Sequence, residues 1–355
     1  MIGAGQAGLA IGHFLSRQGR RFVILDGADS VGAAWRSRWD SLVLFTPRRY
    51  DSLPGLPFPG DSDGYPTRDE VIAYLEEYAA RFELPIELNS AVLELTTADG
   101  KFALDLGGRT IEADQVVVAT GPFQTPRISE LAARLAPAVF QAHSTGYREP
   151  SQVPNGTVLV VGGGNTGFQI AKELSRTHDV HLSVGSRQLP LPQKLLGQDL
   201  FWWLGKFGLL QKTADSRLGR RMRERDTLIG SSPRALRRTG VSMKPRTAAA
   251  SGRTITFADG SELEVDAVIW ATGYRLDQSW ISLPGENGAM IGHIRGVTSE
   301  PGLYFLGLSW QHTRGSALLG WVKDDAEYIA ERIAALAEDR EARTRGQVSK
   351  AGLTE

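Results

Sequence analysis

The sequence predicts an α/β protein built from two similar nucleotide-binding halves, because one long pattern occurs twice along the chain. The first copy opens with a G-x-G-x-x-G turn at residues 3–8 and closes at residues 114–121 with Asp-x-Val-Val-x-Ala-Thr-Gly. The second copy opens at residues 162–167 and closes at residues 266–273 with almost the same residues. A repeat of this length indicates a duplicated domain rather than a solenoid of short units.

Each copy has the pattern strand, turn, helix, strand. In the second copy, the apolar run VLVV at residues 158–161 predicts a strand covered on both faces, and residues 168–174 have helical spacing. In the first copy, only Met1 and Ile2 precede the turn, and residues 21–26 form the next strand. These units predict two Rossmann-like, three-layer domains. We expect Met1 to be a late start, with further apolar residues upstream in the native chain.

Composition limits the classes of function. The 355 residues are enough for about two domains, and the formal net charge is zero, so no nucleic-acid partner is expected. Cysteine is absent, which excludes disulfides, thiol nucleophiles and dithiol redox relays. Redox chemistry would therefore need a bound cofactor. No metal site, integral membrane segment or signal peptide is predicted, and we expect a cytoplasmic protein.

The two turns carry the binding chemistry. Glycine allows the tight turn, the close approach of backbone to a pyrophosphate and the close packing of helix on strand. The helix that follows offers free N–H groups and a partial positive charge to phosphates. The predicted binding residues are Gly3, Gly5 and Gly8 in the first copy and Gly162, Gly164, Asn165, Thr166 and Gly167 in the second.

The two copies differ at the end of their second strand, where such units contact the adenosine ribose. The first copy has Asp26, an acceptor for the free ribose hydroxyls of FAD or NAD. The second copy has Ser186 and Arg187 instead, and an arginine there can hold a 2′-phosphate. We therefore predict FAD at the first copy and NADPH at the second.

Further motifs follow in a fixed order: G-x-x-W-R at residues 32–36, LFTPRRYDSLPGLPFP at 44–59, YPTRDEVIAYLEEYAARF at 65–82, LPQKLLGQDLFWWL at 191–204, WATGY at 270–274 and LGWVKDDAEYIA at 319–330. With the glycine turns, they cover nearly the whole chain. On these motifs the chain resembles the class B flavin-dependent monooxygenases, especially the bacterial CzcO-type flavoproteins and the plant YUCCA-type enzymes.

The resemblance implies roles for several residues. It places Gly32, Trp35 and Arg36 in contact with FAD, Thr46 and Pro47 near the isoalloxazine, and Ala91 and Val92 near the adenine end. It places Thr120, Gly121, Thr272 and Gly273 at the two domain junctions.

A second signature of the family, F-x-G-x-x-x-H-x-x-x-[YF], is only half present. His143 and Tyr147 match it, but Pro137 and Val139 stand where the phenylalanine and glycine would be. This departure favours the CzcO-like branch and weakens the expectation of typical amine oxidation. His143 either orders the connecting segment or has a direct role.

The activity implied by the resemblance is an NADPH-dependent FAD monooxygenase. Hydride passes from NADPH to FAD, O₂ is activated, and a small organic substrate is oxygenated; no catalytic side chain is identified. Two alternatives stay open: an NADPH:acceptor flavin oxidoreductase without oxygen insertion, and a non-catalytic homologue that has lost FAD. Assembly into a homo-oligomer also stays open.

The predicted organisation places the NADPH domain inside the FAD domain. Residues 1–150 would be the first part of the FAD domain and residues 278–337 the return to it. Residues 151–277 would form the NADPH domain, with a helical lid insertion around 190–245. Connecting segments are expected near 141–156 and 274–288, and residues 338–355 should be a polar tail that is disordered at its end.

Three remaining features have competing interpretations. The basic run at residues 217–225, beside the aromatic residues 199–210, is either a lid over the cofactor pocket or a helix on a membrane surface. Trp310, Gln311 and His312 are candidate pocket-lining residues. A helix that starts near residue 320 would point its N-terminus at the flavin, with Asp324 and Asp325 as ordinary first-turn acids.

Overall fold

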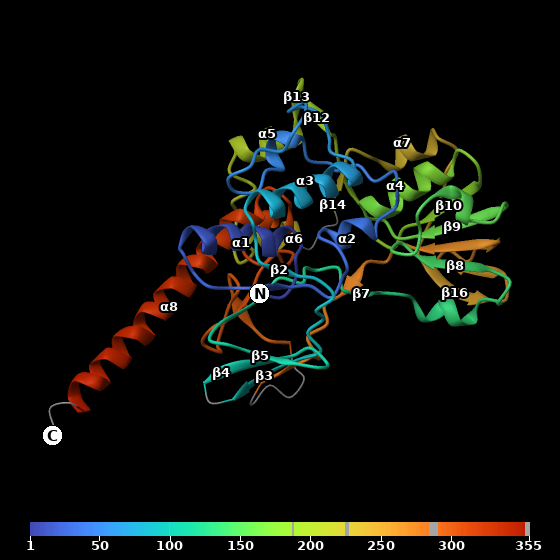
Figure 1. Ribbon diagram of the computed structural model, residues 1–355. Helices are drawn as coiled ribbons and strands as arrows, with labels where there is room; N and C mark the ends of the chain where they lie inside the picture. The colour runs from blue at the N-terminus through green and yellow to red at the C-terminus, as the bar shows by residue number, and fades with distance from the viewer. Residues whose placement is uncertain (99, 187, 224–226, 284–289, 352–355) are drawn as a thin grey trace.

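The computed structural model describes residues 1–98, 100–186, 188–223, 227–283 and 290–351. Two sheets with parallel cores lie side by side, each covered by helices on one face and by a smaller, mainly antiparallel sheet on the other (Figure 1). The first unit comprises residues 1–124 and 276–351, and the second unit comprises residues 127–273. The strands β7 (Thr125–Pro126) and β20 (Tyr274–Arg275) pair antiparallel where the chain crosses between the units.

The sheet of the first unit has a nearly missing strand at its centre. Its strands, in spatial order, are β2 (Ile86–Glu87), β1 (Ile24–Leu25), β6 (Val116–Val118), β24 (Leu303–Phe305), β23 (Val297–Thr298) and β22 (His293–Ile294). Ile2 joins β1 to β6 through parallel bridges to Leu25 and Val118. The backbone N–H of Ile2 donates to the Val117 carbonyl (2.9 Å), so the short segment still connects the two halves of the sheet.

Side chains of this sheet alternate between two cores. Val117 packs against the helical layer formed by α1 (Gln6–Arg17), α3 (Arg68–Arg81) and α8 (Val322–Ala351). Val116 and Val118 point to the other face, which is covered by a second sheet. That sheet consists of β21 (Ile281–Ser282), β3 (Glu94–Ala98), β4 (Lys101–Asp105) and β5 (Thr110–Ala113). This alternation is the two-residue period of a strand covered on both faces.

The second unit repeats the three layers. Its five-stranded parallel sheet has the order β15 (Ser242–Lys244), β10 (Asp179–Ser183), β9 (Thr157–Val161), β19 (Ala267–Trp270) and β8 (Phe140–His143). α4 (Asn165–Leu174) and α7 (Pro233–Arg237) cover one face. β16 (Thr247–Ser251), β17 (Thr254–Phe257) and β18 (Glu262–Glu264) cover the other.

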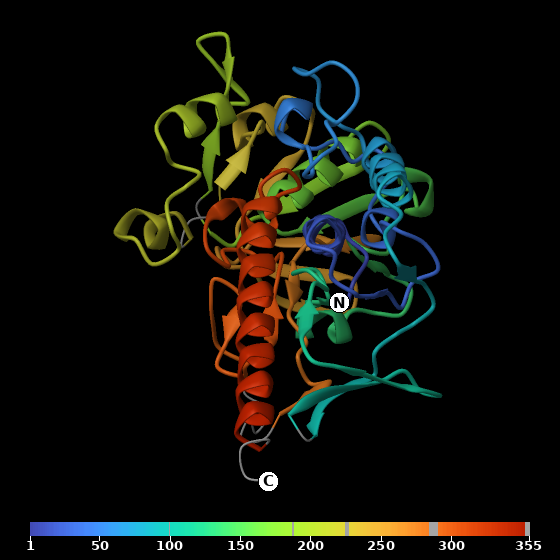
Figure 2. The same ribbon diagram turned by 60° about the vertical axis from the view of Figure 1, so that its left-hand side comes forward.

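Residues 189–223, which we call the cap, leave the second unit and pack over the first. They contain β11 (Leu189–Leu191), β12 (Lys194–Leu195), β13 (Gln198–Asp199), α5 (Leu200–Lys206) and α6 (Arg217–Arg223). β14 (Thr227–Ile229) then returns the chain and pairs in parallel with β11. Figure 2 shows the cap, in yellow-green, projecting from one side of the molecule. The predicted lid is thus partly strand and hairpin rather than wholly helical.

Short helices complete the connections: α2 (Ala33–Arg36), η1 (Arg48–Tyr50), η2 (Glu130–Arg134), η3 (Pro150–Gln152) and η4 (Arg314–Ala317).

Two expectations about connections need correction. The first connecting segment does not begin near residue 141, because β8 pairs in parallel with β19 and forms an edge of the second sheet. The polar tail is helical, since α8 continues to Ala351. Alanine, glutamate and arginine favour helix even without a buried face. The end of the tail, residues 352–355, lies outside the described residues. None of the helices in the described ranges has both the length and the apolar character needed to cross a bilayer.

Candidate functional site

The three glycines of the first turn have three different surroundings. A Cβ on Gly3 (φ +109°) would lie 2.6 Å from the Ala119 carbonyl oxygen, and a Cβ on Gly8 would overlap the Gly3 carbonyl. A Cβ on Gly5, in contrast, would meet no atom within 4 Å. Gly3 and Gly8 are therefore required for packing, whereas Gly5 faces open space at the N-terminus of α1.

The second turn repeats this arrangement. A Cβ on Gly162 (φ +138°) would overlap the Ala271 carbonyl, and one on Gly167 would overlap the Gly162 carbonyl. Gly164 again has nothing within 4 Å. Gly5 and Gly164 are the N-cap residues of α1 and α4, and neither has a side chain that could accept hydrogen bonds from the first helical turn. The N–H groups of these turns therefore remain for a ligand. Both turns thus leave open space beside the N-terminus of a helix, which is typical of a turn that binds a pyrophosphate.

Asn165 and Thr166 lie in the first turn of α4, next to Gly164. The Asn165 side chain accepts a hydrogen bond from the Ile229 N–H (2.9 Å), so it ties β14 to the glycine turn. Asn165 therefore has a structural task besides any contact with a ligand.

Asp26, at the end of β1, lies beside the first turn. Its carboxylate accepts hydrogen bonds from the backbone N–H groups of Ala4 (2.6 Å) and Ala28 (2.9 Å). A carboxylate has about four acceptor positions, so capacity is left for ribose hydroxyls. Ala91 packs against Gly27, where a Cβ would lie 3.1 Å from the Ala91 Cβ, and the half-buried Val92 follows it. The tertiary structure thus brings the turn, Asp26 and Val92 together.

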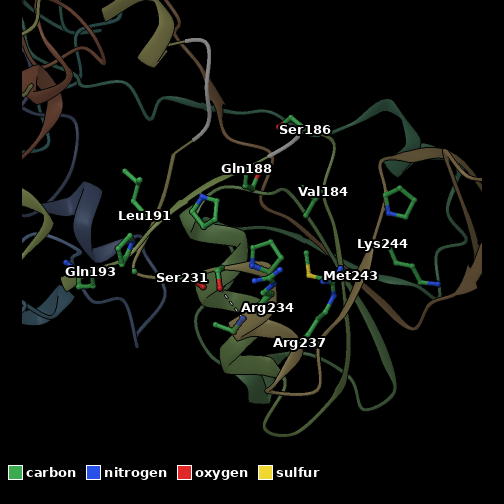
Figure 3. A pocket seen from close by; sticks show the side chains of 17 residues that line it. Val184, Ser186, Gln188, Leu191, Gln193, Ser231, Arg234, Arg237, Met243 and Lys244 are labelled. Atoms are coloured by element: carbon green, nitrogen blue, oxygen red, sulfur yellow. Dashed lines mark hydrogen bonds between the residues drawn. The ribbon is translucent and has the colours of Figure 1, made fainter. Parts of the chain in front are cut away.

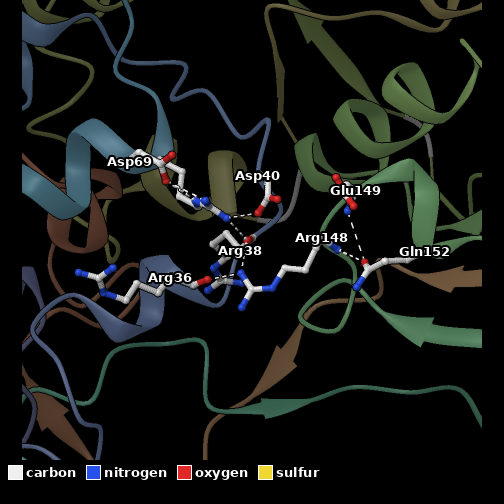
Figure 4. Close-up of polar contacts among 8 residues, drawn as sticks. Arg36, Arg38, Asp40, Asp69, Arg148, Glu149 and Gln152 are labelled. Atoms are coloured by element: carbon white, nitrogen blue, oxygen red, sulfur yellow. Dashed lines mark hydrogen bonds and ion pairs between the residues drawn. The ribbon is translucent and has the colours of Figure 1, made fainter.

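The G-x-x-W-R segment forms α2, and the side chains of Trp35 and Arg36 point in different directions. Trp35 packs against the core beneath α1 and α3, whereas Arg36 forms an ion pair with Glu76 on α3. The backbone carbonyls of Arg36 and Arg38 accept hydrogen bonds from Arg148, as Figure 4 shows. This segment is therefore fixed to the start of the second unit.

Thr46 is buried and donates a hydrogen bond to Asp51 (2.6 Å). Asp51 is completely buried, and its second oxygen has no hydrogen-bond partner. Burial raises the pKa of Asp51 to about 7, against the opposing effects of the Thr46 hydrogen bond and the positive charge of Arg48. The sequence reasoning missed Asp51, although its place five residues after Thr46 could have suggested that the two side chains meet.

The two Ala-Thr-Gly segments end at the crossing between the units. Gln124 donates hydrogen bonds to the Thr120 hydroxyl (2.8 Å) and the Gly121 carbonyl (2.9 Å). Thr272 donates to the Arg127 carbonyl, and the Gly273 carbonyl accepts a hydrogen bond from the Arg127 N–H (2.9 Å).

His143 and Tyr147 have structural roles. The His143 ring lies 3.0 Å from the Gly273 carbonyl through Nε2 and 3.0 Å from the Thr145 hydroxyl through Nδ1. The Tyr147 hydroxyl donates to Glu173 (2.7 Å) on α4. His143 therefore orders the crossing between the units, which was one of its two interpretations.

A pocket of about 900 Å³ opens beside the second turn, at the end of β10 (Figure 3). Ser186 and Gln188 line one side, whereas Arg187 lies outside the described residues. Gln188 lies against Gly163 in the turn, and its side-chain oxygen is buried without a partner.

Three basic side chains that the sequence reasoning missed also line this pocket. Arg234 and Arg237 come from α7, and Lys244 ends β15. Among the described lining residues there is no acidic side chain. The signal was present in the run PRALRR. A helix that precedes a strand parallel to β10 begins at the carboxyl edge of the sheet, which is the edge where β10 ends.

An aromatic cluster joins the cap to the first unit. The buried ring of Phe201 contacts Phe45, Tyr50 and Trp321, with centroids 5.6 to 6.4 Å apart. Gln193 donates to the Phe45 carbonyl (2.8 Å) on the same side of the cap. Phe45 directly precedes Thr46 in the chain, and Trp321 directly precedes α8.

The loop before α8 is fixed by its own hydrogen bonds. The Gln311 side chain donates to the Phe305 carbonyl (3.0 Å) and accepts from the Leu308 N–H (3.2 Å), so it is structural. The His312 carbonyl accepts a hydrogen bond from the cap residue Ala214 (2.7 Å). Trp310 has positive φ (+58°) in this loop.

At the start of α8, Asp325 is paired with Arg295 (2.9 Å), as expected for a first-turn acid without a catalytic task. Burial raises the pKa of Asp324. Arg314 in η4 is half-buried, and burial lowers the pKa of its guanidinium. The sequence reasoning did not single out Arg314.

Comparisons with known proteins agree with this geometry. The family model described as pyridine nucleotide-disulphide oxidoreductase matches residues 1–193. An oxidoreductase described as CzcO-like from Geobacillus kaustophilus is 48% identical over 94% of this chain and 97% of its own length. The rice indole-3-pyruvate monooxygenase YUCCA1 is 29% identical over 81% of this chain and 79% of its own length.

Among solved structures, the flavin-containing monooxygenase from Stenotrophomonas maltophilia matches with a TM-score of 0.79 and 31% identity. The match covers 95% of this chain and 97% of that one. Fold, glycine turns and relatives together define a flavin-dependent oxidoreductase. The chain belongs to the pyridine nucleotide-disulphide oxidoreductase family and, within it, to the class B flavin-dependent monooxygenases.

Proposed function

We propose that this protein is an NADPH-dependent FAD monooxygenase of a small organic substrate, built from two Rossmann-like domains. FAD would lie on the first glycine turn and NADPH on the second. When bound, FAD accepts a hydride and supplies the oxygen chemistry, and the chain's side chains position the reactants and exclude water. The observation that carries the NADPH assignment is the basic pocket at the end of β10.

The first unit has the groups that FAD needs. The open face of Gly5 and the uncapped amides of α1 would hold the pyrophosphate, and Asp26 would accept the ribose hydroxyls. Asp51 holds the Thr46 hydroxyl in one orientation through their 2.6 Å hydrogen bond. The Phe201 cluster covers this region and would keep water out of it.

The second unit has the groups that distinguish NADPH from NADH. Gly164 and the N-terminus of α4 would hold the pyrophosphate. Ser186, Arg234, Arg237 and Lys244 line one pocket at the end of β10 and would bind the 2′-phosphate. Arg187, which is expected to contribute as well, lies outside the described residues.

The test uses the full chain saturated with FAD. We expect NADPH to be oxidised with at least tenfold higher kcat/KM than NADH. With a panel of sulfides, amines, ketones and 2-oxo acids, at least one product should gain one oxygen atom per NADPH consumed. Release of one H₂O₂ per NADPH with every compound would instead support the acceptor oxidoreductase. A protein that takes up no FAD would contradict both activities.

A further inference from the structure

The cap exposes an unusual number of apolar side chains. Eleven large hydrophobic side chains are exposed among the described residues, and five of them lie between residues 189 and 223: Leu189, Leu195, Leu196, Phe207 and Leu218. This segment is about a tenth of the chain. Exposed apolar side chains that gather on one surface mark a contact site, and in the cap the hairpin tip and α5 bring several of them together.

The most exposed of these residues occupies a position that normally excludes it. β12 and β13 are joined by the two-residue turn Leu196–Gly197, and both residues have positive φ (+51° and +79°). Such turns select Asn, Asp or Gly at the first position, because a bulky side chain is strained there. Leu196 nevertheless projects with 84% of its surface exposed. A strained, exposed leucine at a hairpin tip does not stabilise the fold, so it indicates a contact with another molecule.

The helix behind the hairpin has two distinct faces. Leu200, Phe201 and Leu204 are buried against the first unit. Trp203 and Phe207, one turn apart, lie on the outer side and stack at 5.9 Å between ring centroids. The Trp203 ring N–H donates to the Leu195 carbonyl (2.9 Å), so helix and hairpin tip form one surface.

The charge of the cap identifies the class of partner. Residues 189–223 contain seven basic and two acidic side chains, while the whole chain has a formal net charge of zero. Lys194 is adjacent to the leucines, and the Lys206 ammonium lies 4.6 Å from the centroid of Trp202. Exposed leucine and tryptophan beside lysine, in a segment with an excess of basic side chains, are typical of a surface that lies in a membrane interface.

We propose that the outer face of the cap binds the surface of a membrane rich in anionic lipids, with Leu195 and Leu196 inserted among the lipid chains. Trp203 and Phe207 would lie at headgroup level, and the basic side chains would contact lipid phosphates. A second copy of the chain fits less well, because a two-fold contact through this face would place like charges opposite each other. The proposal does not depend on the reaction that the enzyme catalyses.

The test is co-sedimentation of the FAD-loaded full chain with vesicles in 0.1 M salt. We expect binding to vesicles of equal phosphatidylglycerol and phosphatidylcholine, weakened at least fivefold on pure phosphatidylcholine or in 0.5 M salt. Leu196→Asn suits the turn better than leucine, so it should keep or raise the melting temperature and weaken binding at least fivefold. Ile294→Asn, at a residue 82% exposed in β22, is the matched control and should bind like the wild type.

Two results would overturn the proposal. One is absence of binding to the anionic vesicles in 0.1 M salt. The other is equal binding by the Leu196→Asn and Ile294→Asn variants. Sedimentation equilibrium completes the test by measuring the oligomeric state. If the wild type is a dimer that does not bind vesicles, and Leu196→Asn makes it a monomer, the face contacts a second copy of the chain instead.

Discussion

Phe201 of the cap stacks on Phe45 of the first unit, with ring centroids 6.0 Å apart and planes inclined by 7°. The two residues are far apart in the sequence, and they belong to different units of the fold. Phe45 directly precedes Thr46, so the contact closes the cap over the region where we propose the flavin to lie.

Phe201→Ala should loosen the packing of the cap on the first unit. Removing a fully buried phenylalanine costs about 3–5 kcal/mol of the free energy of unfolding, measured by urea denaturation. The loosened cap should also raise the H₂O₂ released per NADPH oxidised, because water would enter the region that it covers. Phe207→Ala, on the exposed side of the same helix, should change the free energy of unfolding by less than about 0.5 kcal/mol. Equal stability of the two variants would contradict a closed cap.

Two glycines of the second turn should respond differently to alanine. Gly164→Ala adds a Cβ in open space at φ −80°, so the melting temperature should stay close to the wild type. The new methyl group would obstruct the pyrophosphate and raise the KM for NADPH about tenfold or more. Gly167→Ala should lower the melting temperature strongly, because its Cβ would overlap the Gly162 carbonyl. An unaltered KM in the Gly164 variant would argue against NADPH at this turn.

The basic pocket should set the preference for NADPH. Arg234→Gln and Arg237→Gln should each lower kcat/KM for NADPH roughly 10- to 100-fold, since a hydrogen bond to a charged group contributes about 1.5–3 kcal/mol. The values for NADH should change little, because NADH lacks the 2′-phosphate. Arg238→Gln is the matched control, as this exposed neighbour does not line the pocket. Equal losses with both coenzymes would contradict phosphate recognition here.

Asp51 should make stability depend on pH. Its pKa is about 7 in the fold, above the ordinary aspartate value of 3.8, so the folded state favours the protonated form. Its stabilising effect is complete below pH 4, is lost as the pH rises to 7, and stays constant above that. The loss is at most about 4 kcal/mol, since one pKa unit corresponds to about 1.4 kcal/mol.

The measurement is urea unfolding of the wild type and Asp51→Asn between pH 4 and pH 8. The difference in their free energies of unfolding should shift in favour of the variant as the pH rises, because asparagine does not ionise. A difference that stays constant over this range would show that Asp51 is not protonated at neutral pH in the fold.

Part of the architecture could be predicted because local rules determine it. The glycine turns, their helices and the apolar strands followed from residue type and spacing, since packing needs Gly3, Gly8, Gly162 and Gly167 wherever such a turn forms. The place of β8 could not be predicted in this way. Residues 140–143 become a strand only because β19, more than a hundred residues later, offers a free edge.

The candidate site divides in the same manner. The two glycine turns and the position of Asp26 could be predicted from residue type and spacing, because each belongs to a short stretch of the chain. The burial of Asp51 against Thr46, the pocket that Arg234 and Arg237 share with Ser186, and the exposed apolar side chains of the cap could be seen only in the folded chain. These features come from segments that are distant in sequence, and their burial and charge are set by neighbours that folding supplies.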